Sequence, residues 1–188
     1  MHSQTRLDLR SARMLVIDDN TQSAELIAQM LMGFRVGKVE VCRTPQEGAE
    51  TIAARRYDLL IIDADMQGVD GITFTRDLRT QSDKINYTTP VILISSHTPV
   101  GKVQSARDAG ANLVVKTPIA PATLLNRIVW LARNGRPFVS SDGYCGPDRR
   151  FKKLPPPEGT GERRADALAL TASPEREMSQ DEVDALFG

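Results

Sequence analysis

The sequence has little of what marks a membrane, secreted or zinc-thiolate protein. Its two cysteines, Cys42 and Cys145, are too few for a disulfide framework, and their separation suits no zinc motif. The longest apolar runs, residues 59–62 and 91–94, are far shorter than the ~20 residues that a membrane-spanning helix needs. The polar start of the chain has no apolar stretch behind it like that of a signal peptide. We therefore expect a soluble, cytoplasmic protein without membrane insertion.

Net charge is also absent, because 24 Lys and Arg residues balance 24 Asp and Glu residues. A zero net charge argues against a dominant electrostatic attachment to nucleic acid, although it leaves room for a local patch. No helix-turn-helix, kinase or cyclase signature follows residue 134. We expect neither DNA binding nor an enzymatic output domain.

Composition divides the 188 residues into three parts. Residues 1–11 read as a flexible leader, and residues 12–134 alternate short apolar runs with amphipathic stretches, as a folded domain does. After Asn134-Gly135, which is typical of a helix end, the chain becomes rich in Gly, Pro and charge. We expect residues 135–188 to form a mostly disordered tail.

Within residues 12–134 the pattern predicts strands and helices in alternation. Short apolar runs predict strands at 14–17, 39–42, 59–62, 91–94 and 113–115. Helical spacing predicts helices at 23–32, 45–55, 72–78, 100–109 and 121–133. Five such units favour an α/β fold in which an open parallel sheet has helices on both faces. Ligands of such sheets bind beyond the carboxyl ends of the strands.

Acidic and hydroxyl side chains follow these predicted strands. The first strand ends in Asp18-Asp19, the third in Asp63 and the fourth in Ser95-Ser96. Three carboxylates beside a hydroxyl form an oxygen-rich site suited to Mg²⁺, and they leave one aspartate as the nucleophile for an acyl phosphate. The alternative is that each acid only caps the helix that follows it.

Four segments together resemble the response-regulator receiver domain. The segments are similar to its opening strand, its phosphoacceptor region, its fourth strand and the approach to its fifth: residues 15–20, residues 57–66 with Gly68, Asp70 and Gly71, residues 91–96, and residues 108–111. The resemblance covers about residues 12–134. It implies a flavodoxin-like fold whose five-stranded parallel sheet has the strand order 2-1-3-4-5.

Carried over by position, the resemblance implies that Asp63 accepts the phosphoryl group. It also implies a Mg²⁺ ion that is bound directly by Asp19 and through water by Asp18. Asp65, two residues past the acceptor, would lend its backbone carbonyl to the metal. The resemblance thus makes the acidic cluster a metal and phosphoryl site.

The same resemblance implies a switch at the end of the fourth strand. Ser95 would hydrogen-bond a phosphoryl oxygen, and Ser96 would occupy the small-residue position beside it. The phosphate would then pull the Ser95 loop inward and change the surface of the fourth helix, fifth strand and fifth helix. The family's switch aromatic is missing, because Val114 (or Leu113, if the register slips) stands in its place.

A second departure concerns the family's lysine, which directly precedes a proline at the end of the fifth strand. Here Thr117 precedes Pro118, and Lys116 comes one residue earlier. Neighbouring strand residues point to opposite faces, so Lys116 either aims away from the pocket or is brought back by a local bulge. Both Lys116 and Thr117 stay candidates for contact with the phosphate.

Residues 144–153 place four cations beside two aromatic side chains. Such a patch can pair with phosphates through arginine forks, and a cyclic dinucleotide is one candidate ligand. A solvated basic stretch in a linker is the alternative. The four cations are Arg149, Arg150, Lys152 and Lys153.

The end of the chain predicts a short amphipathic helix at 178–187. Ser179 with Glu182 three residues later forms a capping box. An apolar stripe can then form from Met178, Val183, Leu186 and Phe187. The segment resembles the N-terminal segment by which the flagellar switch protein binds the activated chemotaxis regulator. That resemblance implies a helix-in-groove ligand for a receiver surface, its own or another's; a frayed acidic terminus is the alternative.

Three functions are compatible with these motifs. The first is a phosphorelay response regulator, not an enzyme, which a sensor histidine kinase or phosphotransfer protein phosphorylates on Asp63. It would signal through contacts with a downstream protein, such as another receiver domain or a flagellar or chemotaxis component. The second is a phosphorylation-independent adaptor that binds a nucleotide second messenger through its arginine-rich tail, which Thr117 favours. The third, a phosphatase using Asp63 and Asp65, is disfavoured because Gln67 stands where a Thr is usual.

Overall fold

The computed structural model describes residues 8–82, 84–141, 144–148 and 175–187. Five parallel strands form one sheet in the order β2-β1-β3-β4-β5, so the predicted α/β fold and strand order are confirmed. The strands of this sheet are β1 (Arg13–Ile17), β2 (Lys38–Cys42), β3 (Leu59–Asp63), β4 (Val91–Ser95) and β5 (Leu113–Lys116). The helices are α1 (Thr21–Gly33), α2 (Pro45–Ala54), α3 (Gly71–Thr80), α4 (Val100–Asp108), α5 (Pro121–Arg133) and α6 (Gln180–Phe187).

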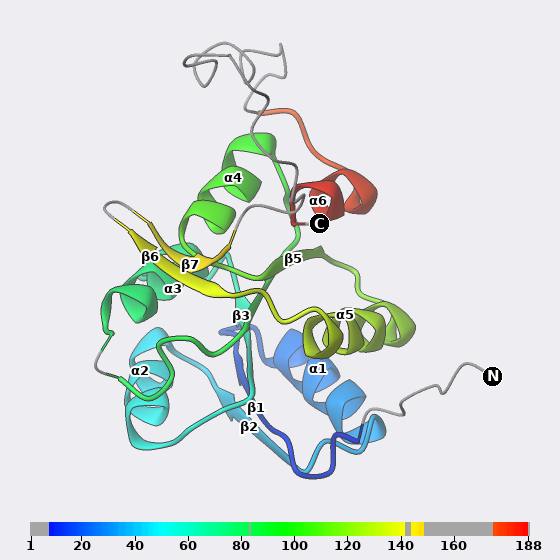
Figure 1. The fold of residues 1–188 in the computed structure, drawn as a ribbon. Coiled ribbons are helices and arrows are strands. Elements are labelled where there is room, and N and C mark those ends of the chain that lie inside the picture. Colours follow the sequence, from blue (N-terminus) through cyan, green and yellow to red (C-terminus); the bar gives the residue numbers. More distant parts are fainter. Residues whose placement is uncertain (1–7, 83, 142–143, 149–174, 188) are drawn as a thin grey trace, which may run out of the picture.

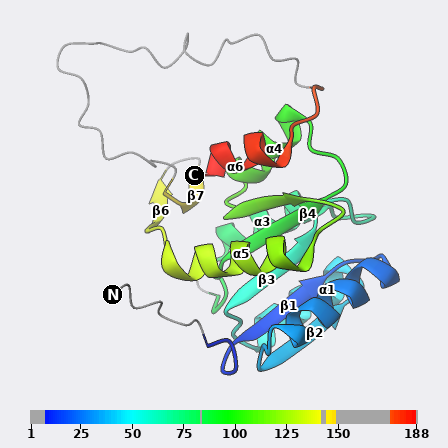
Figure 2. The ribbon, with the colours of Figure 1, turned by 90° about the vertical axis from the view of Figure 1, so that its right-hand side faces the viewer.

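Helices cover both faces of the sheet. Figures 1 and 2 show α1 and α5 on one face and α2, α3 and α4 on the other. The three inner strands are buried almost throughout, from Met14 in β1 to Ser95 in β4. Their continuous apolar runs are therefore explained by burial on both faces. The register pairs Ile17 with Ile62, so that the carboxyl ends of β1 and β3 lie together.

Polar side chains set the starts of the helices that follow the sheet. Asn20, Thr44 and Asp70 each accept hydrogen bonds from backbone N–H groups in the first turn of α1, α2 and α3. Such caps satisfy donors that have no partner inside the helix. The cap at Asn20 starts α1 at Thr21, two residues before the predicted start at Ser23. It also fixes the loop that carries Asp18 and Asp19.

A second, two-stranded sheet lies in the part of the chain that was predicted to be disordered. β6 (Phe138–Ser141) pairs antiparallel with β7 (Tyr144–Pro147), and the pair lies over α3. The expectation that the tail begins at residue 135 is wrong for these residues. The missed signal is the Asp142-Gly143 dipeptide between two short β-prone runs, which is typical of hairpin turns.

Arg79 of α3 connects this hairpin to the domain. Its side chain is 2% exposed and donates hydrogen bonds to the carbonyls of Gly110 (3.1 Å), Tyr87 (2.7 Å) and Thr89 (2.8 Å). Its guanidinium carbon lies 5.3 Å from the ring centroid of Phe138 in β6. Burial lowers the pKa of Arg79 to about 10. The buried cation is thus held by carbonyl oxygens and an aromatic ring.

The end of the chain also departs from a disordered tail. Residues 175–187 lie against the domain, and α6 contacts β5 in particular. The predicted helix at 178–187 is present as Gln180–Phe187, and Ser179 and Glu182 form the predicted capping box. Four predicted anion-binding residues lie outside the described residues: Arg149, Arg150, Lys152 and Lys153.

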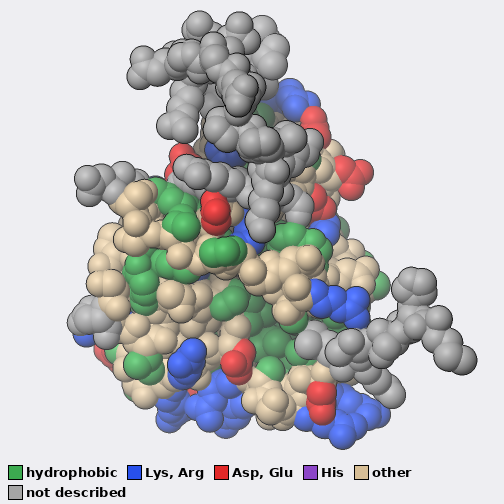
Figure 3. All heavy atoms as spheres, viewed as in Figure 1, with side chains coloured by type: hydrophobic (Ala, Val, Ile, Leu, Met, Phe, Trp, Pro, Cys, Tyr) green, Lys and Arg blue, Asp and Glu red, His purple; other side chains and the backbone are tan. Residues whose placement is uncertain are grey.

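Zero net charge hides an uneven surface. On the face shown in Figure 3, Lys and Arg side chains gather along the lower edge, while Asp and Glu side chains show around α6. Among the described residues, none of the helices is both long enough and apolar enough to cross a membrane.

Replacing Arg79 with Met should lower the free energy of unfolding by about 2–4 kcal/mol, because two buried carbonyls and one part-buried carbonyl lose their donor. Arg76→Met, at an exposed position of the same helix, should change it by less than about 0.5 kcal/mol. Urea unfolding of both variants checks this difference. Equal effects of the two substitutions would contradict the role of Arg79.

Candidate functional site

Three aspartates meet at the carboxyl ends of β1 and β3. One carboxylate oxygen each from Asp18, Asp19 and Asp63 lies within 4.8 Å of the others. The backbone holds two of these side chains: the N–H of Asn20 donates to Asp18 (2.8 Å), and the N–H of Gln67 donates to Asp19 (2.8 Å). The predicted acidic cluster is therefore present, and it is not explained by helix capping, because Asn20 itself caps α1.

The Asp63 carboxyl is partly buried beside other acids. Burial raises the pKa of Asp63 to about 6. The charges of Asp18, Asp65 and Asp19 add to the rise, against one hydrogen bond from the Asp65 backbone that lowers it. These surroundings make the charged form of the Asp63 carboxyl less stable than it is in water. A cation would relieve the repulsion.

The donor set fits Mg²⁺. All three side chains supply carboxylate oxygens, the hard ligands that Mg²⁺ prefers, and the unrelieved charge on Asp63 is what a divalent cation neutralises. Asp19 is exposed, which leaves room for the water ligands that Mg²⁺ usually keeps.

A hydroxyl and an ammonium group adjoin the cluster. The Ser95 hydroxyl lies 2.9 Å from Asp65 Oδ2 and 2.6 Å from the carbonyl oxygen of His97, and its one proton can serve only one of them at a time. The ammonium of Lys102 donates to Ser95 Oγ (2.7 Å) and forms an ion pair with Asp65. Burial works to raise the pKa of Asp65, but hydrogen bonds from Lys102 and Ser95 outweigh it and lower that pKa.

Lys102 was not predicted as a site residue. It stands in the first turn of α4, where a long side chain leans back toward the start of the helix and reaches the Ser95 loop. The only signal in the sequence was a lysine seven positions after Ser95. This spacing indicates a contact with Ser95 only when the start and rotation of α4 are known.

Lys116 lies elsewhere. Its ammonium contacts Glu177 Oε2 at 3.1 Å, so no local bulge returns its side chain to the pocket. Lys116 pairs with Ser95 across the parallel strands, and the backbone N–H of Thr117 donates to the Ser95 carbonyl at 2.9 Å. Ser96 is exposed next to Ser95. The alternation of strand side chains has turned Lys116 toward the C-terminal residues.

Val114, which the sequence predicts to stand in place of the family's switch aromatic, lies in β5 opposite Leu93 of β4. It is 4% exposed and, together with Ser95 and Lys102, lines a cavity of about 10 Å³. That space is too small for an aromatic ring.

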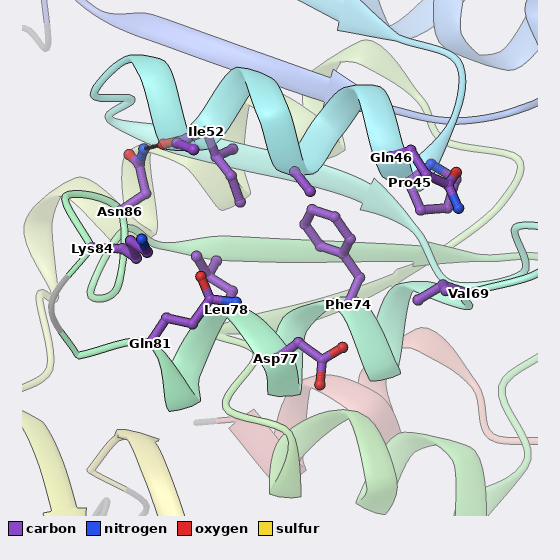
Figure 4. Close-up of a pocket in the computed structure, with 12 residues that line it drawn as sticks. Pro45, Gln46, Ile52, Val69, Phe74, Asp77, Leu78, Gln81, Lys84 and Asn86 are labelled. Carbon is purple, nitrogen blue, oxygen red and sulfur yellow. Dashed lines mark hydrogen bonds between the residues drawn. The ribbon is translucent and has the colours of Figure 1, made fainter.

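A separate groove lies between α2 and α3. Figure 4 shows Phe74 and Leu78 from α3 facing Ile52 from α2. These side chains line a cavity of about 220 Å³. The amide of Asn86 closes one end by donating to the Ile52 carbonyl at 2.6 Å. None of the lining residues belongs to the acidic cluster, so this groove is distinct from the candidate site.

A parallel sheet of this order, with acids at the ends of β1 and β3 and a hydroxyl at the end of β4, defines a receiver-type signalling domain. The model of the response regulator receiver domain matches residues 14–129. The chain belongs to this family.

Curated relatives extend the match. The chain is 30% identical over 136 residues to the sensory/regulatory protein RpfC of Xanthomonas campestris pv. campestris, which covers 72% of this chain and 18% of RpfC. It is 31% identical over 144 residues to the response regulator MprA of Mycobacterium bovis, which covers 77% of this chain and 59% of MprA. The chain thus spans only part of the length of these relatives.

Solved structures agree with the fold. The chemotaxis protein CheY4 of Vibrio cholerae is 26% identical with a TM-score of 0.59, over 63% of this chain and 97% of CheY4. The receiver domain of the Francisella response regulator 1452 is 25% identical with a TM-score of 0.60, over 67% of this chain and 100% of that domain. These similarities cover the receiver part of the chain.

Asp63→Asn should raise the free energy of unfolding at pH 7.5 in EDTA by about 1 kcal/mol; solvent screening makes this less than the full shift implies. The folded-state pKa of about 6 exceeds the unfolded value, so the penalty of the charged carboxyl is complete above pH 6 and disappears as pH falls toward 4. Urea unfolding at pH 7.5 and pH 5 should show a smaller gain at pH 5. Asp77→Asn, exposed on α3, is the control; a gain that is the same at both pH values would contradict this account.

Proposed function

We propose that the chain is a phosphorelay response regulator that accepts a phosphoryl group on Asp63. The observation that carries the proposal is the meeting of three carboxylates beside the Ser95 hydroxyl in a receiver fold. Receiver domains of this family take phosphoryl groups from histidine kinases or phosphotransfer proteins, and we propose such a partner here. Most members of the family are signalling domains rather than enzymes.

The transfer is a displacement at phosphorus. A carboxylate oxygen of Asp63 forms a bond to phosphorus, the bond from phosphorus to the donor's nitrogen or oxygen breaks, and the leaving group keeps that electron pair. Asp18, Asp19 and Asp63 would hold Mg²⁺, which offsets charge on the carboxylates and the phosphoryl oxygens. That the backbone carbonyl of Asp65 joins the metal remains a prediction from the family.

Lys102 supplies the positive charge that the family's lysine supplies elsewhere. Thr117 occupies that lysine's position, and Lys116 is engaged by Glu177. Lys102 instead reaches Ser95, the residue expected to hydrogen-bond a phosphoryl oxygen. A phosphoryl group on Asp63 would compete with Asp65 for this ammonium, since both offer anionic oxygens.

This arrangement favours the phosphorelay function over a phosphorylation-independent adaptor. The adaptor hypothesis rested on Thr117 in the lysine position, and the contacts of Lys102 with Ser95 and Asp65 support the proposal that Lys102 supplies the cation instead. A cyclic dinucleotide at residues 149–153 remains a prediction about residues outside the described part of the chain. A flagellar or chemotaxis partner is likewise still a prediction.

Incubation with Mg²⁺ and acetyl phosphate should add one phosphoryl mass to the full chain, as intact-protein mass spectrometry detects. Asp63→Asn should abolish the adduct, because no other carboxylate occupies the nucleophile's position at the end of β3. An adduct of equal yield in Asp63→Asn would contradict the assignment, and so would no adduct in the wild-type chain.

Lys102→Met should slow this phosphorylation roughly 10- to 100-fold, the loss typical when one charge-stabilising donor is removed. Lys102→Arg should retain part of the rate because it keeps the cation. Lys116→Met serves as the matched control and should stay within about twofold of wild type, since its ammonium faces Glu177. Equal slowing by Lys102→Met and Lys116→Met would overturn the role of Lys102.

A further inference from the structure

Residues 176–187, the C-terminal segment, are bound to the chain's own receiver domain by an apolar anchor. Val183 and Phe187 are fully buried, and Met178 is 7% exposed. These side chains belong to the same apolar core as the strands of the sheet, while Leu186 is only partly buried at its border. The predicted apolar stripe therefore faces the domain. Val183 and Phe187, four residues apart on one face of α6, are typical of an amphipathic helix in a groove, and Met178 extends the contact just before the helix begins.

The side chain of Gln180 forms hydrogen bonds with the backbone at the edge of the sheet. Its side-chain Nε2 donates to the Val114 carbonyl at 3.1 Å, and its Oε1 accepts from the Lys116 N–H at 2.7 Å. β5 is the edge strand, so these two backbone groups face outward from the ladder. One amide thus satisfies a donor and an acceptor of the strand. Neither a carboxylate nor a methyl group at this position could do both.

The charges of the segment complement those of the domain. Glu177 contacts the Lys116 ammonium, and Asp184 forms an ion pair with Arg127 of α5. Positive side chains on β5 and α5 thus meet acids on the segment. This pairing gives the face a preference for an acidic ligand.

A fourth attachment joins the segment to the loop that starts at Ser95. The Met178 N–H donates to the Thr98 carbonyl (2.9 Å), and the Thr98 hydroxyl donates to the Met178 carbonyl (2.8 Å). The Thr98 N–H donates to Glu177 Oε2 at 2.8 Å. Thr98 is only three residues after Ser95, whose hydroxyl lies beside the His97 carbonyl. Ser95 is thus linked, through the peptide unit between His97 and Thr98, to the groups that hold Met178 and Glu177.

We propose that the C-terminal segment is a detachable ligand of this face, and that the face binds the same segment of a second copy of the chain once its own is displaced. A phosphoryl group on Asp63 would draw Lys102 and the Ser95 hydroxyl toward itself. The hydroxyl would then leave the His97 carbonyl, which loosens the attachment at Thr98. This part of the proposal rests on the proposed function. A ligand held in the same chain competes at a high effective concentration, so the segment of another chain binds only after displacement.

A fluorescent peptide with the sequence of residues 175–188, titrated against the full chain, tests the docking. Val183→Asp places a charge in a buried position and should free the face, so this variant should bind the peptide at least about tenfold more tightly than wild type does. Ala185→Asp, an exposed position of α6, should behave as wild type. A peptide that itself carries Val183→Asp should not bind. Equal peptide binding by wild type and Val183→Asp, or no binding by either, would overturn the proposal.

Hydrogen exchange of the segment's amides in the wild-type chain tests the link to Asp63. Addition of Mg²⁺ and acetyl phosphate should speed exchange at residues 178–187 severalfold, and Asp63→Asn should show no change. A phosphoryl adduct without faster exchange would overturn the link but leave the proposed function standing. A chain that forms no adduct would instead refute the proposed function and with it the link, while the peptide titration still decides the docking.

Discussion

The Ser95 hydroxyl is the contact on which the functional account depends. It lies between two sets of partners, with Asp65 and Lys102 on the side of the acidic cluster and the His97 carbonyl on the side of the C-terminal segment. A hydroxyl has one proton, so its bond to one acceptor excludes the other. The proposed function requires that a new anion near Asp63 changes which partner this hydroxyl serves. We propose that the loop to Thr98 transmits that change over three residues, because Val114 stands where the family has its switch aromatic.

Charge balance explains why the cation comes from an unexpected place. Burial raises the pKa of Asp63 and the neighbouring carboxylates add to the rise, so the proposed phosphoryl group would need positive charge beside it. Strand alternation turns Lys116 toward Glu177, and the sequence predicts that Thr117 stands in the position of the usual lysine. Lys102 reaches the same region from the neighbouring helix. A buried anion without a positive partner is destabilising. Whether an ammonium group relieves this depends on where the group lies and not on which helix or strand carries it.

The sequence was sufficient for the sheet and the acids, because buried parallel strands leave continuous apolar runs and place their last residues at one edge. It was not sufficient for Lys102, whose reach depends on the rotation of α4 against the sheet. The hairpin at 138–147 was missed because the glycine- and proline-rich composition outweighed one turn dipeptide. The apolar stripe that includes Val183 and Phe187 predicted an amphipathic helix. The pattern alone does not identify the surface against which this helix packs.

The central claim is that the Asp63 pocket and the C-terminal segment are coupled through Ser95 and Thr98. Coupling between two equilibria is reciprocal, so freeing the segment must strengthen the binding of a phosphoryl mimic. The most direct measurement is the equilibrium affinity of the full chain for beryllium fluoride with Mg²⁺, compared between Val183→Asp and Ala185→Asp. The account predicts that Val183→Asp binds beryllium fluoride more tightly than Ala185→Asp does. The ratio of the two affinities should equal the factor by which beryllium fluoride weakens the docking of the C-terminal segment in the wild-type chain. Equal affinity in the two variants would contradict it.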